Sequence, residues 1–327
     1  MNKRSAVRLT LAAAAAVAIP ICALAQDFTP IGDRIVSDPA YLPLHGQFFG
    51  DTGYAYDRTD GHEFDAAGTN VESRRHTINL VHQAFAYGLT DDLSFNVGVA
   101  YDFSGRTRVN APGGERTFDQ SGFEDPTFGL TWRAIDERSH PVSLDLFTAY
   151  SPDVVSSTTA NGSQDASVAR GGPEFDVGAA LARETRFFTI RGEAKGRYFG
   201  VSTQDNLTTG ATVRTASYWV PSLGVETQSR LNDRLSVNVG ADYNFNGDPH
   251  VVNSATGVEH IAQLGDYQDV NVALNYHFVP NALVGSVNYR HEFHDRNINV
   301  FPADPTANTQ FDRDGDGVGV QLRYVFK

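Results

Sequence analysis

Five polar residues, four of them charged, occupy every second position in one stretch: Thr189, Arg191, Glu193, Lys195 and Arg197. Alternate residues of a β-strand face the same side, so these side chains would form one charged row. Such a row cannot face lipid, where a basic residue near the bilayer midplane costs roughly 2 to 4 kcal/mol. The row therefore predicts a strand with a polar, inward-facing side.

Further charged residues fall on the corresponding side of other candidate strands: Arg133, Asp145, Glu174, Asp176, Glu226, Arg290, Glu292 and Arg323. Charged rings at a constriction select what passes a pore. The same charges could instead pair across a narrow interior and stabilise it, or hold a specific ligand. We favour the first role and keep the other two open.

One acidic segment matches the first half of a calcium-binding loop, because Asp312, Asp314 and Asp316 are followed by Gly317. Position twelve of such a loop should be a glutamate, but it is Arg323, and the full motif fails. An acidic turn before the last strand is the preferred interpretation, with a loop-bound divalent cation as the alternative. We expect no other metal and no cofactor.

Catalysis needs a nucleophile beside a positioned base. His82 and His291 are the histidines on candidate strands, and neither has a recognisable serine partner in the sequence. We therefore expect no catalytic residues and no enzyme.

A period of two runs through the whole chain. In residues 93–104, Leu93, Phe95 and Val97 begin an apolar side, while Ser94 and Asn96 begin a small polar side. We count about twelve such strands, the last ending at Phe326. A soluble β-sandwich would also alternate.

The lengths of the connections distinguish a soluble β-sandwich from a membrane-spanning β-barrel. Short turns at 90–92, 136–141, 184–186, 232–233 and 280–281 alternate with long polar connections at 58–72, 105–121, 152–171, 202–212, 247–257 and 295–312. Short inner turns and long outer loops are typical of bacterial outer-membrane barrels. The fold class is therefore all-β: a transmembrane antiparallel up-and-down barrel of about twelve strands, over residues 45–327.

The first 25 residues indicate export. Lys3, Arg4 and Arg8 precede a short apolar run, and Ala23 and Ala25 suit a signal peptidase. Cys22, the only cysteine of the chain, follows Ile21 rather than the small residue that a lipoprotein signal requires. The sequence thus predicts a signal peptide at 1–25 and a Gram-negative outer-membrane location.

The rest of the chain is strongly acidic. It keeps 23 of the 26 basic residues and all 39 acidic residues. This excess argues against a nucleic-acid partner. The expected partners are outer-membrane lipid and lipopolysaccharide, the barrel-assembly machinery and a small solute.

Residues 26–44 precede the first strand, and their prolines argue against a long helix. They form either a periplasmic tail or a plug inside the barrel. If they are a plug, deletion of residues 27–42 should raise conductance.

Two motifs resemble a known family. They are Tyr87-Gly88-Leu89-Thr90 and the stretch from Gly122 to Arg133, which contains Asp125 and ends in Trp132-Arg133. They are similar to motifs of the outer-membrane transporters labelled as the MetA pathway of phenol degradation. In this chain Glu124 stands where that family usually has glycine, and Trp132 where it has tyrosine. The resemblance implies a barrel that passes small hydrophobic or aromatic compounds, and it brings no catalytic residues.

We therefore expect a porin-like outer-membrane channel or transporter for small solutes, hydrophobic or aromatic compounds among them. The alternative is a structural or surface-interaction barrel with a blocked lumen.

Overall fold

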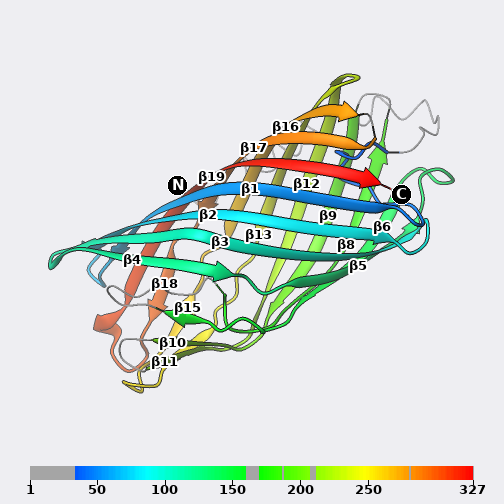
Figure 1. Ribbon diagram of the computed structural model, residues 1–327. Helices are drawn as coiled ribbons and strands as arrows, with labels where there is room; N and C mark the ends of the chain where they lie inside the picture. The colour runs from blue at the N-terminus through cyan, green and yellow to red at the C-terminus, as the bar shows by residue number, and fades with distance from the viewer. Residues whose placement is uncertain (1–33, 160–168, 186–187, 207–210, 280, 327) are drawn as a thin grey trace.

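The chain forms a closed antiparallel β-barrel (Figure 1). The computed structural model describes residues 34–159, 169–185, 188–206, 211–279 and 281–326. The wall is a 12-strand barrel closed by pairing of the first strand with the last. These strands are β1 (Phe48–Phe64), β2 (Asn70–Gly88), β3 (Leu93–Ala111), β5 (Thr127–Ile135), β6 (Ser143–Ser151), β8 (Glu174–Glu184), β9 (Phe188–Phe199), β12 (Tyr218–Asn232), β13 (Leu235–Asn244), β16 (Tyr267–Val279), β17 (Leu283–His294) and β19 (Thr309–Phe326).

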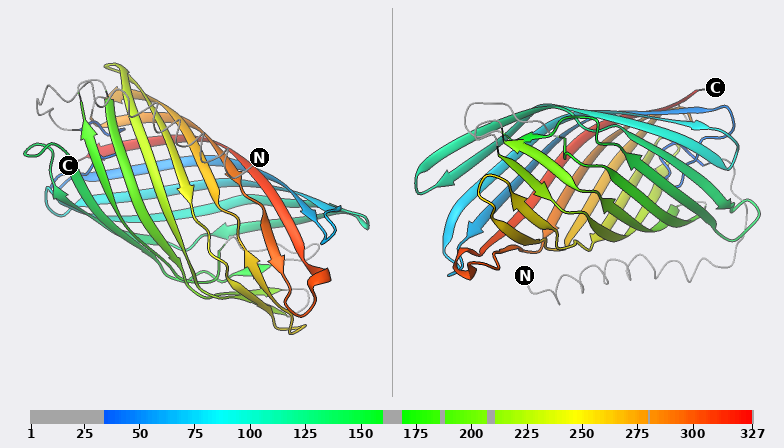
Figure 2. Two further views of the ribbon diagram at one scale, coloured as in Figure 1. Left: turned by 180° about the vertical axis from the view of Figure 1, so that it is seen from behind. Right: turned by 90° about the horizontal axis from the view of Figure 1, so that it is seen from below.

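Short elements extend the end of the barrel that carries the long connections, called here the loop end. They are β4 (Gly114–Phe123), β7 (Thr158–Thr159), β10 (Ser202–Asn206), β11 (Thr212–Thr215), β14 (His250–Asn253), β15 (Glu259–Gln263), β18 (Asn297–Val300) and the 3-10 helix η1 (Pro305–Ala307). Strand β4 continues the line of β5 along β3. Figure 2 shows the hairpins β1–β2 and β3–β4 projecting beyond the neighbouring strands.

The expected loop boundaries differ from the structure at this end. Most of 58–72 and 105–121 is strand, and the intervening connections are only 65–69 and 112–113. Beyond the membrane both sides of a hairpin can be polar, so the hydrophobic period disappears although the backbone pairing continues. Alternation alone therefore ends the strands too early.

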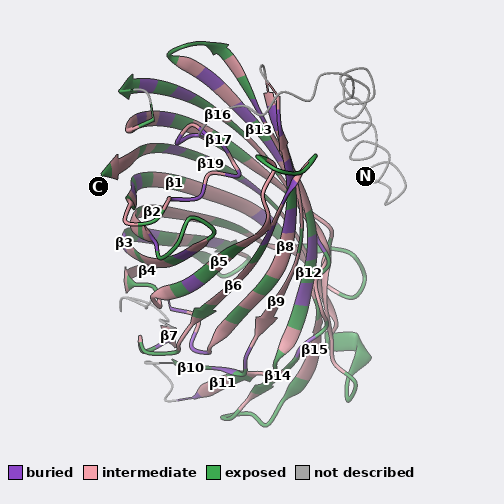
Figure 3. Cartoon of the chain, turned by 90° about the vertical axis from the view of Figure 1, so that its right-hand side faces the viewer, coloured by how far each residue is buried: buried purple, intermediate pink, exposed green. Residues whose placement is uncertain are grey.

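The strand register gives every strand of the wall one side that faces the interior and one side that faces outward. Lys195 lies opposite Gly178 on one side and Ser222 on the other, and Ser222 lies opposite Asn244. Large apolar side chains occupy the other side, where Leu223 and Val287 are each 56% exposed. Figure 3 shows the resulting bands along the strands. An apolar exterior around a polar interior is the arrangement of a membrane barrel and the reverse of a soluble one.

Aromatic side chains mark both rims of the apolar belt. At the end with the short turns, called the turn end, Phe48 stacks on Phe326 at a centroid distance of 5.5 Å and contacts Tyr87. Near the loop end, outward-facing pairs include Tyr101 with Phe123 and Tyr198 with Trp219. Girdles of this kind lie at the two membrane–water interfaces.

The turn end has tight connections. In the turn between β16 and β17, Asn281 has a φ of 58°, a left-handed conformation that asparagine tolerates better than most residues. None of the described residues forms a helix long and apolar enough to cross a membrane.

The segment 34–47 folds back into the turn end of the barrel before β1 begins. Val36 is 1% exposed, and Ser37 and Ala40 are equally well covered. Ser37 contacts β12, β13 and β16, whereas Arg34 contacts β6 on another part of the wall. A segment that reaches several parts of the wall lies inside the barrel. The predicted signal peptide, 1–25, and residues 26–33 lie outside the described residues.

Candidate functional site

The polar interior contains two cavities that share one residue. The outer chamber, toward the loop end, has a volume of about 400 Å³ and includes Arg197, Tyr267, Arg290 and Arg313 in its lining. The inner chamber has a volume of about 360 Å³, and Arg290 also lines it. Arg290 therefore lies at the junction of the two chambers, where its side chain is 46% exposed.

The register places all twelve charged residues predicted to line the interior on the inner side of the wall: Arg133, Asp145, Glu174, Asp176, Arg191, Glu193, Lys195, Arg197, Glu226, Arg290, Glu292 and Arg323. Lys195, Arg197 and Glu292 line the outer chamber, and Glu226 and Arg323 line the inner one. The other residues of the set line neither chamber, apart from Arg290, which lines both.

These charges pair along the wall. Arg197 is 2.9 Å from Asp176 on the adjacent strand, and Arg290 is 3.0 Å from Asp57 and 3.1 Å from Glu292. On β9, Arg191 and Lys195 both contact Glu193. Pairing between neighbours satisfies the charges without drawing opposite walls together. These pairs therefore lie along the wall, whereas the predicted alternative places them across a narrow interior.

Arg133 and Asp145 form the most buried of these pairs. The guanidinium donates two parallel hydrogen bonds of 2.9 and 3.0 Å to the carboxylate, and it also donates to the carbonyl oxygen of Ala40. Bidentate pairs of this kind combine energy with a fixed orientation. The wall residue Arg133 thereby holds the N-terminal segment in place.

A band of uncharged polar side chains lies at the turn-end side of the inner chamber, and two of its members, Asn238 and Asn275, also line that chamber. The amide of Gln228 donates to Asn238 at 3.2 Å, Asn275 donates to Asn238 at 2.9 Å, and Ser286 donates to Asn275 at 2.6 Å. Gln228 also donates to the hydroxyl of Ser37 at 2.7 Å. The band crosses β12, β13, β16 and β17 and forms a polar seat for the N-terminal segment.

Charged residues fix the other side of that segment. Arg34 is 2.9 Å from Asp38 and 2.8 Å from Glu137. Asp38 accepts further hydrogen bonds from the backbone N–H of Ala40 and from Thr189. Burial alone would lower the pKa of Arg34, but the carboxylates of Asp38 and Glu137 raise it above its ordinary value. The guanidinium therefore stays charged inside the barrel.

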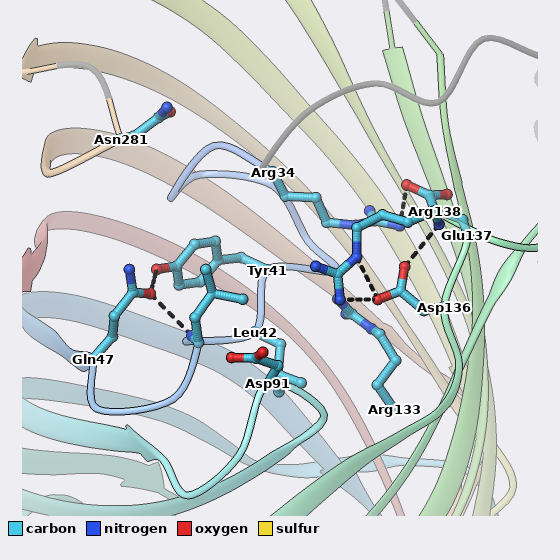
Figure 4. A pocket seen from close by; sticks show the side chains of 11 residues that line it. Arg34, Tyr41, Leu42, Gln47, Asp91, Arg133, Asp136, Glu137, Arg138 and Asn281 are labelled. Carbon is cyan, nitrogen blue, oxygen red and sulfur yellow. Dashed lines mark hydrogen bonds and ion pairs between the residues drawn. The ribbon is translucent and has the colours of Figure 1, made fainter.

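Beyond this segment, at the turn end, lies a smaller cavity of about 110 Å³ (Figure 4). Arg34, Tyr41 and Leu42 line it together with the turn residues Asp136 and Arg138. In Figure 4 Arg34 reaches Glu137 of this turn, and Arg138 reaches Asp136. Residues 34–44 thus separate this turn-end cavity from the inner chamber.

The candidate calcium residues lie elsewhere. Asp312, Asp314 and Asp316 alternate along the outer side of β19, so the predicted acidic turn or loop is wrong. Asp316 accepts hydrogen bonds from Tyr289 and contacts His291. A straight strand spreads its carboxylates out instead of curling them around one ion. Within the described ranges, no cluster of three or more metal-ligating side chains is present.

The two histidines weighed for catalysis, His82 and His291, both contact carboxylates. His82 faces inward, 3.3 Å from Asp51, and His291 faces outward, 2.8 Å from Asp316. Asp51 also pairs with Arg323 at 3.2 Å. Sequence reasoning missed Asp51 and Asp57, although both lie opposite in parity to the apolar Tyr54 and Tyr56 and could have been assigned to the inner side.

No family model matches this chain, and no curated protein does. Among solved structures, the chain is similar to an outer membrane channel from Pseudomonas putida F1 at a TM-score of 0.57, with 13% identity over 88% of this chain and 99% of that one. It is also similar to the transport unit of the autotransporter AIDA-I from Escherichia coli at a TM-score of 0.52, with 9% identity over 86% and 90% of the two chains. The fold is therefore that of an outer-membrane β-barrel.

Proposed function

We propose that this protein is an outer-membrane channel for small solutes, with its turn end in the periplasm. The observation that carries the proposal is the pair of adjoining chambers, lined by charged side chains and meeting at Arg290. Charged and polar linings at close quarters select what passes a pore.

Small hydrophobic or aromatic compounds are the solute class that we favour. Two observations support this choice: the resemblance of residues 86–133 to the transporters labelled as the MetA pathway of phenol degradation, and the aromatic side chains that line the outer chamber. Phe199, Tyr218 and Tyr267 are all part of that lining. Their rings offer apolar surface inside an interior that is otherwise polar.

In this proposal residues 34–44 are a plug, and the structure is the closed state. A solute that reaches the inner chamber meets Ser37 and the amide band below it. Passage into the periplasm requires the plug to shift or leave. The predicted signal peptide at 1–25 would export the chain, and the barrel-assembly machinery and outer-membrane lipid would be its partners during insertion.

A second candidate is a surface-interaction barrel with a permanently blocked lumen. The observation that favours it is the close burial of the plug, where Asp38 is 3% exposed and Gln228 is fully buried. In that case the acidic loop end would carry the function.

Single-channel recording in planar bilayers tests the proposal. The refolded protein is compared with the double variant Arg191→Ala, Lys195→Ala, and with a control double variant, Arg108→Ala, Arg116→Ala, that removes two positive charges from the exposed β3–β4 hairpin. We expect a current whose ion selectivity changes in the first variant and not in the control. A correctly folded barrel that carries no current at any voltage would favour the second candidate.

A further inference from the structure

One arginine of the outer chamber, Arg313, differs from the other basic residues there in its contacts with the described carboxylates. Four basic side chains line this chamber, and Lys195, Arg197 and Arg290 each lie within 4.0 Å of a carboxylate. Among the described residues, none brings a carboxylate that close to Arg313. Within the described ranges, the Arg313 side chain makes one hydrogen bond, which Nε donates to Nδ1 of His294 over 3.3 Å.

That hydrogen bond fixes the orientation of the guanidinium. An arginine can only donate, so Nδ1 of His294 accepts, and Nε2 of His294 carries the proton that it donates to Glu292 at 3.0 Å. The His294 side chain is 3% exposed, so this chain of contacts is held rigidly. The two Nη groups of Arg313 are left for the chamber. Their planar fork matches the two oxygens of a carboxylate.

Aromatic rings surround the same part of the chamber. Tyr267 stacks on His294 with 5.0 Å between centroids and an interplanar angle of 19°. Phe199 stacks on Tyr218 at 4.9 Å, and Arg170 covers this second pair from 4.5 Å above Phe199. Two pairs of inward-facing rings, one on β9 and β12 and the other on β16 and β17, provide apolar surface in the chamber that Arg313 lines.

Two of the three acidic residues of the chamber, Asp242 and Asp269, belong to another part of its lining, whereas the third, Glu292, pairs with Arg290 and contacts His294. Asp242 and Asp269 lie opposite each other on β13 and β16. Both interact electrostatically with Lys195, whereas the neighbours that act on Arg313 are Glu292, Tyr267 and Tyr218. A cationic ligand would be drawn to the aspartates, and an anionic ligand to Arg313.

We propose that the outer chamber binds the carboxylate of an aromatic acid, with the two Nη groups of Arg313 on the carboxylate and the ring against Tyr267 and its neighbours. This inference rests on the proposed channel function, because it names a solute class for the same lumen. Binding takes place on the loop-end side of the plug. It therefore does not require the channel to open.

Isothermal titration of the refolded full-length protein in detergent tests this site, with benzoate, benzyl alcohol and acetate as probes. We expect benzoate to bind more tightly than either of the other two, because only benzoate has both the ring and the carboxylate. In Arg313→Gln the benzoate affinity should fall about tenfold or more, as expected when a charged hydrogen-bonding partner is lost. The control Arg108→Gln, which removes an exposed positive charge on β3, should leave it unchanged.

Two further variants keep the outcome decisive. Arg313→Lys retains the charge without the fork and should recover part of the affinity, and Tyr267→Leu should weaken benzoate and benzyl alcohol together. Equal affinity for benzoate and benzyl alcohol, or benzoate binding that Arg313→Gln leaves intact, would overturn the inference while the conductance result stands. Benzoate binding by a barrel that never conducts would instead refute the channel and keep the site.

Discussion

The closed state depends on one buried carboxylate, and its removal should open the channel. Asp38 belongs to the N-terminal plug and accepts hydrogen bonds from Arg34, from the backbone of Ala40 and from Thr189 of the wall. Its side chain is inaccessible to solvent, and that of Arg34 is 7% exposed. In Asp38→Ala the guanidinium loses one of its two carboxylate partners and keeps Glu137 and the hydroxyl of Ser143.

The size of the effect follows from these contacts. Breaking a buried ion pair by removing one partner costs about 3 to 5 kcal/mol. Arg34 retains its 2.8 Å contact with Glu137, so the lower part of that range applies. A loss of about 3 kcal/mol shifts the ratio of closed to open plug by roughly 150-fold.

Planar-bilayer recording measures this ratio as the fraction of time spent in the conducting state. Asp233→Ala, which removes an exposed carboxylate from the turn between β12 and β13, is the matched control and should behave as the unmodified protein. Limited proteolysis should also cut the N-terminal segment faster in Asp38→Ala. If both variants show the same open fraction as the unmodified protein, the contacts of Asp38 do not hold the plug.

Three other substitutions probe the wall. Leu223→Arg, in the middle of β12 on the lipid-facing side, should destabilise the folded barrel by about 2 to 4 kcal/mol. Leu231→Arg lies near the turn end of the same strand and should cost about 1 kcal/mol or less. Reversible unfolding in detergent or lipid measures both losses, and equal losses would contradict the assigned membrane position. Arg290→Gln removes the positive charge between Asp57 and Glu292 at the junction of the chambers. The channel should become more selective for cations, seen as a shifted reversal potential in a salt gradient, whereas an unchanged potential would mean that current bypasses this residue.

The membrane-spanning part of the fold could be predicted from the sequence because lipid imposes a strict rule on it. Leu93, Phe95 and Val97 must face outward along β3, and the charged row from Arg191 to Arg197 must face inward along β9. A one-residue error would place charges in lipid. The parity of each strand is therefore fixed wherever both types of residue alternate.

The parts of the fold that were not predicted are those that lie outside the lipid, where no such rule fixes which side of a strand is apolar. The outer halves of β1 to β3 lie beyond the membrane and show no apolar side. Asp312 resembles the start of a cation loop, yet the backbone there pairs with β1 as an extended strand. The interpretation of this segment as a turn or loop also left Arg313 without a predicted side. The continuous strand β19 places Arg313 on the inner side, together with Arg323.

The plug could be named as an alternative but not chosen from the sequence. Its contacts are long-range hydrogen bonds, such as those of Ser37 with Gln228 and His277. No local periodicity encodes such pairs. The amide band was missed for the same reason, although Gln228, Asn238 and Asn275 all carry polar side chains at inward positions.

Deletion of residues 27–42 tests the proposed channel and its N-terminal plug most directly. The central claim is that a solute pathway runs through the barrel and that the N-terminal segment closes it. The measurement is the single-channel conductance of the deletion variant beside that of the full-length barrel, with folding of both checked by heat-modifiable gel mobility. We expect a larger and steadier conductance after the deletion, and an unchanged conductance in a folded barrel would show that residues 27–42 do not close the pathway.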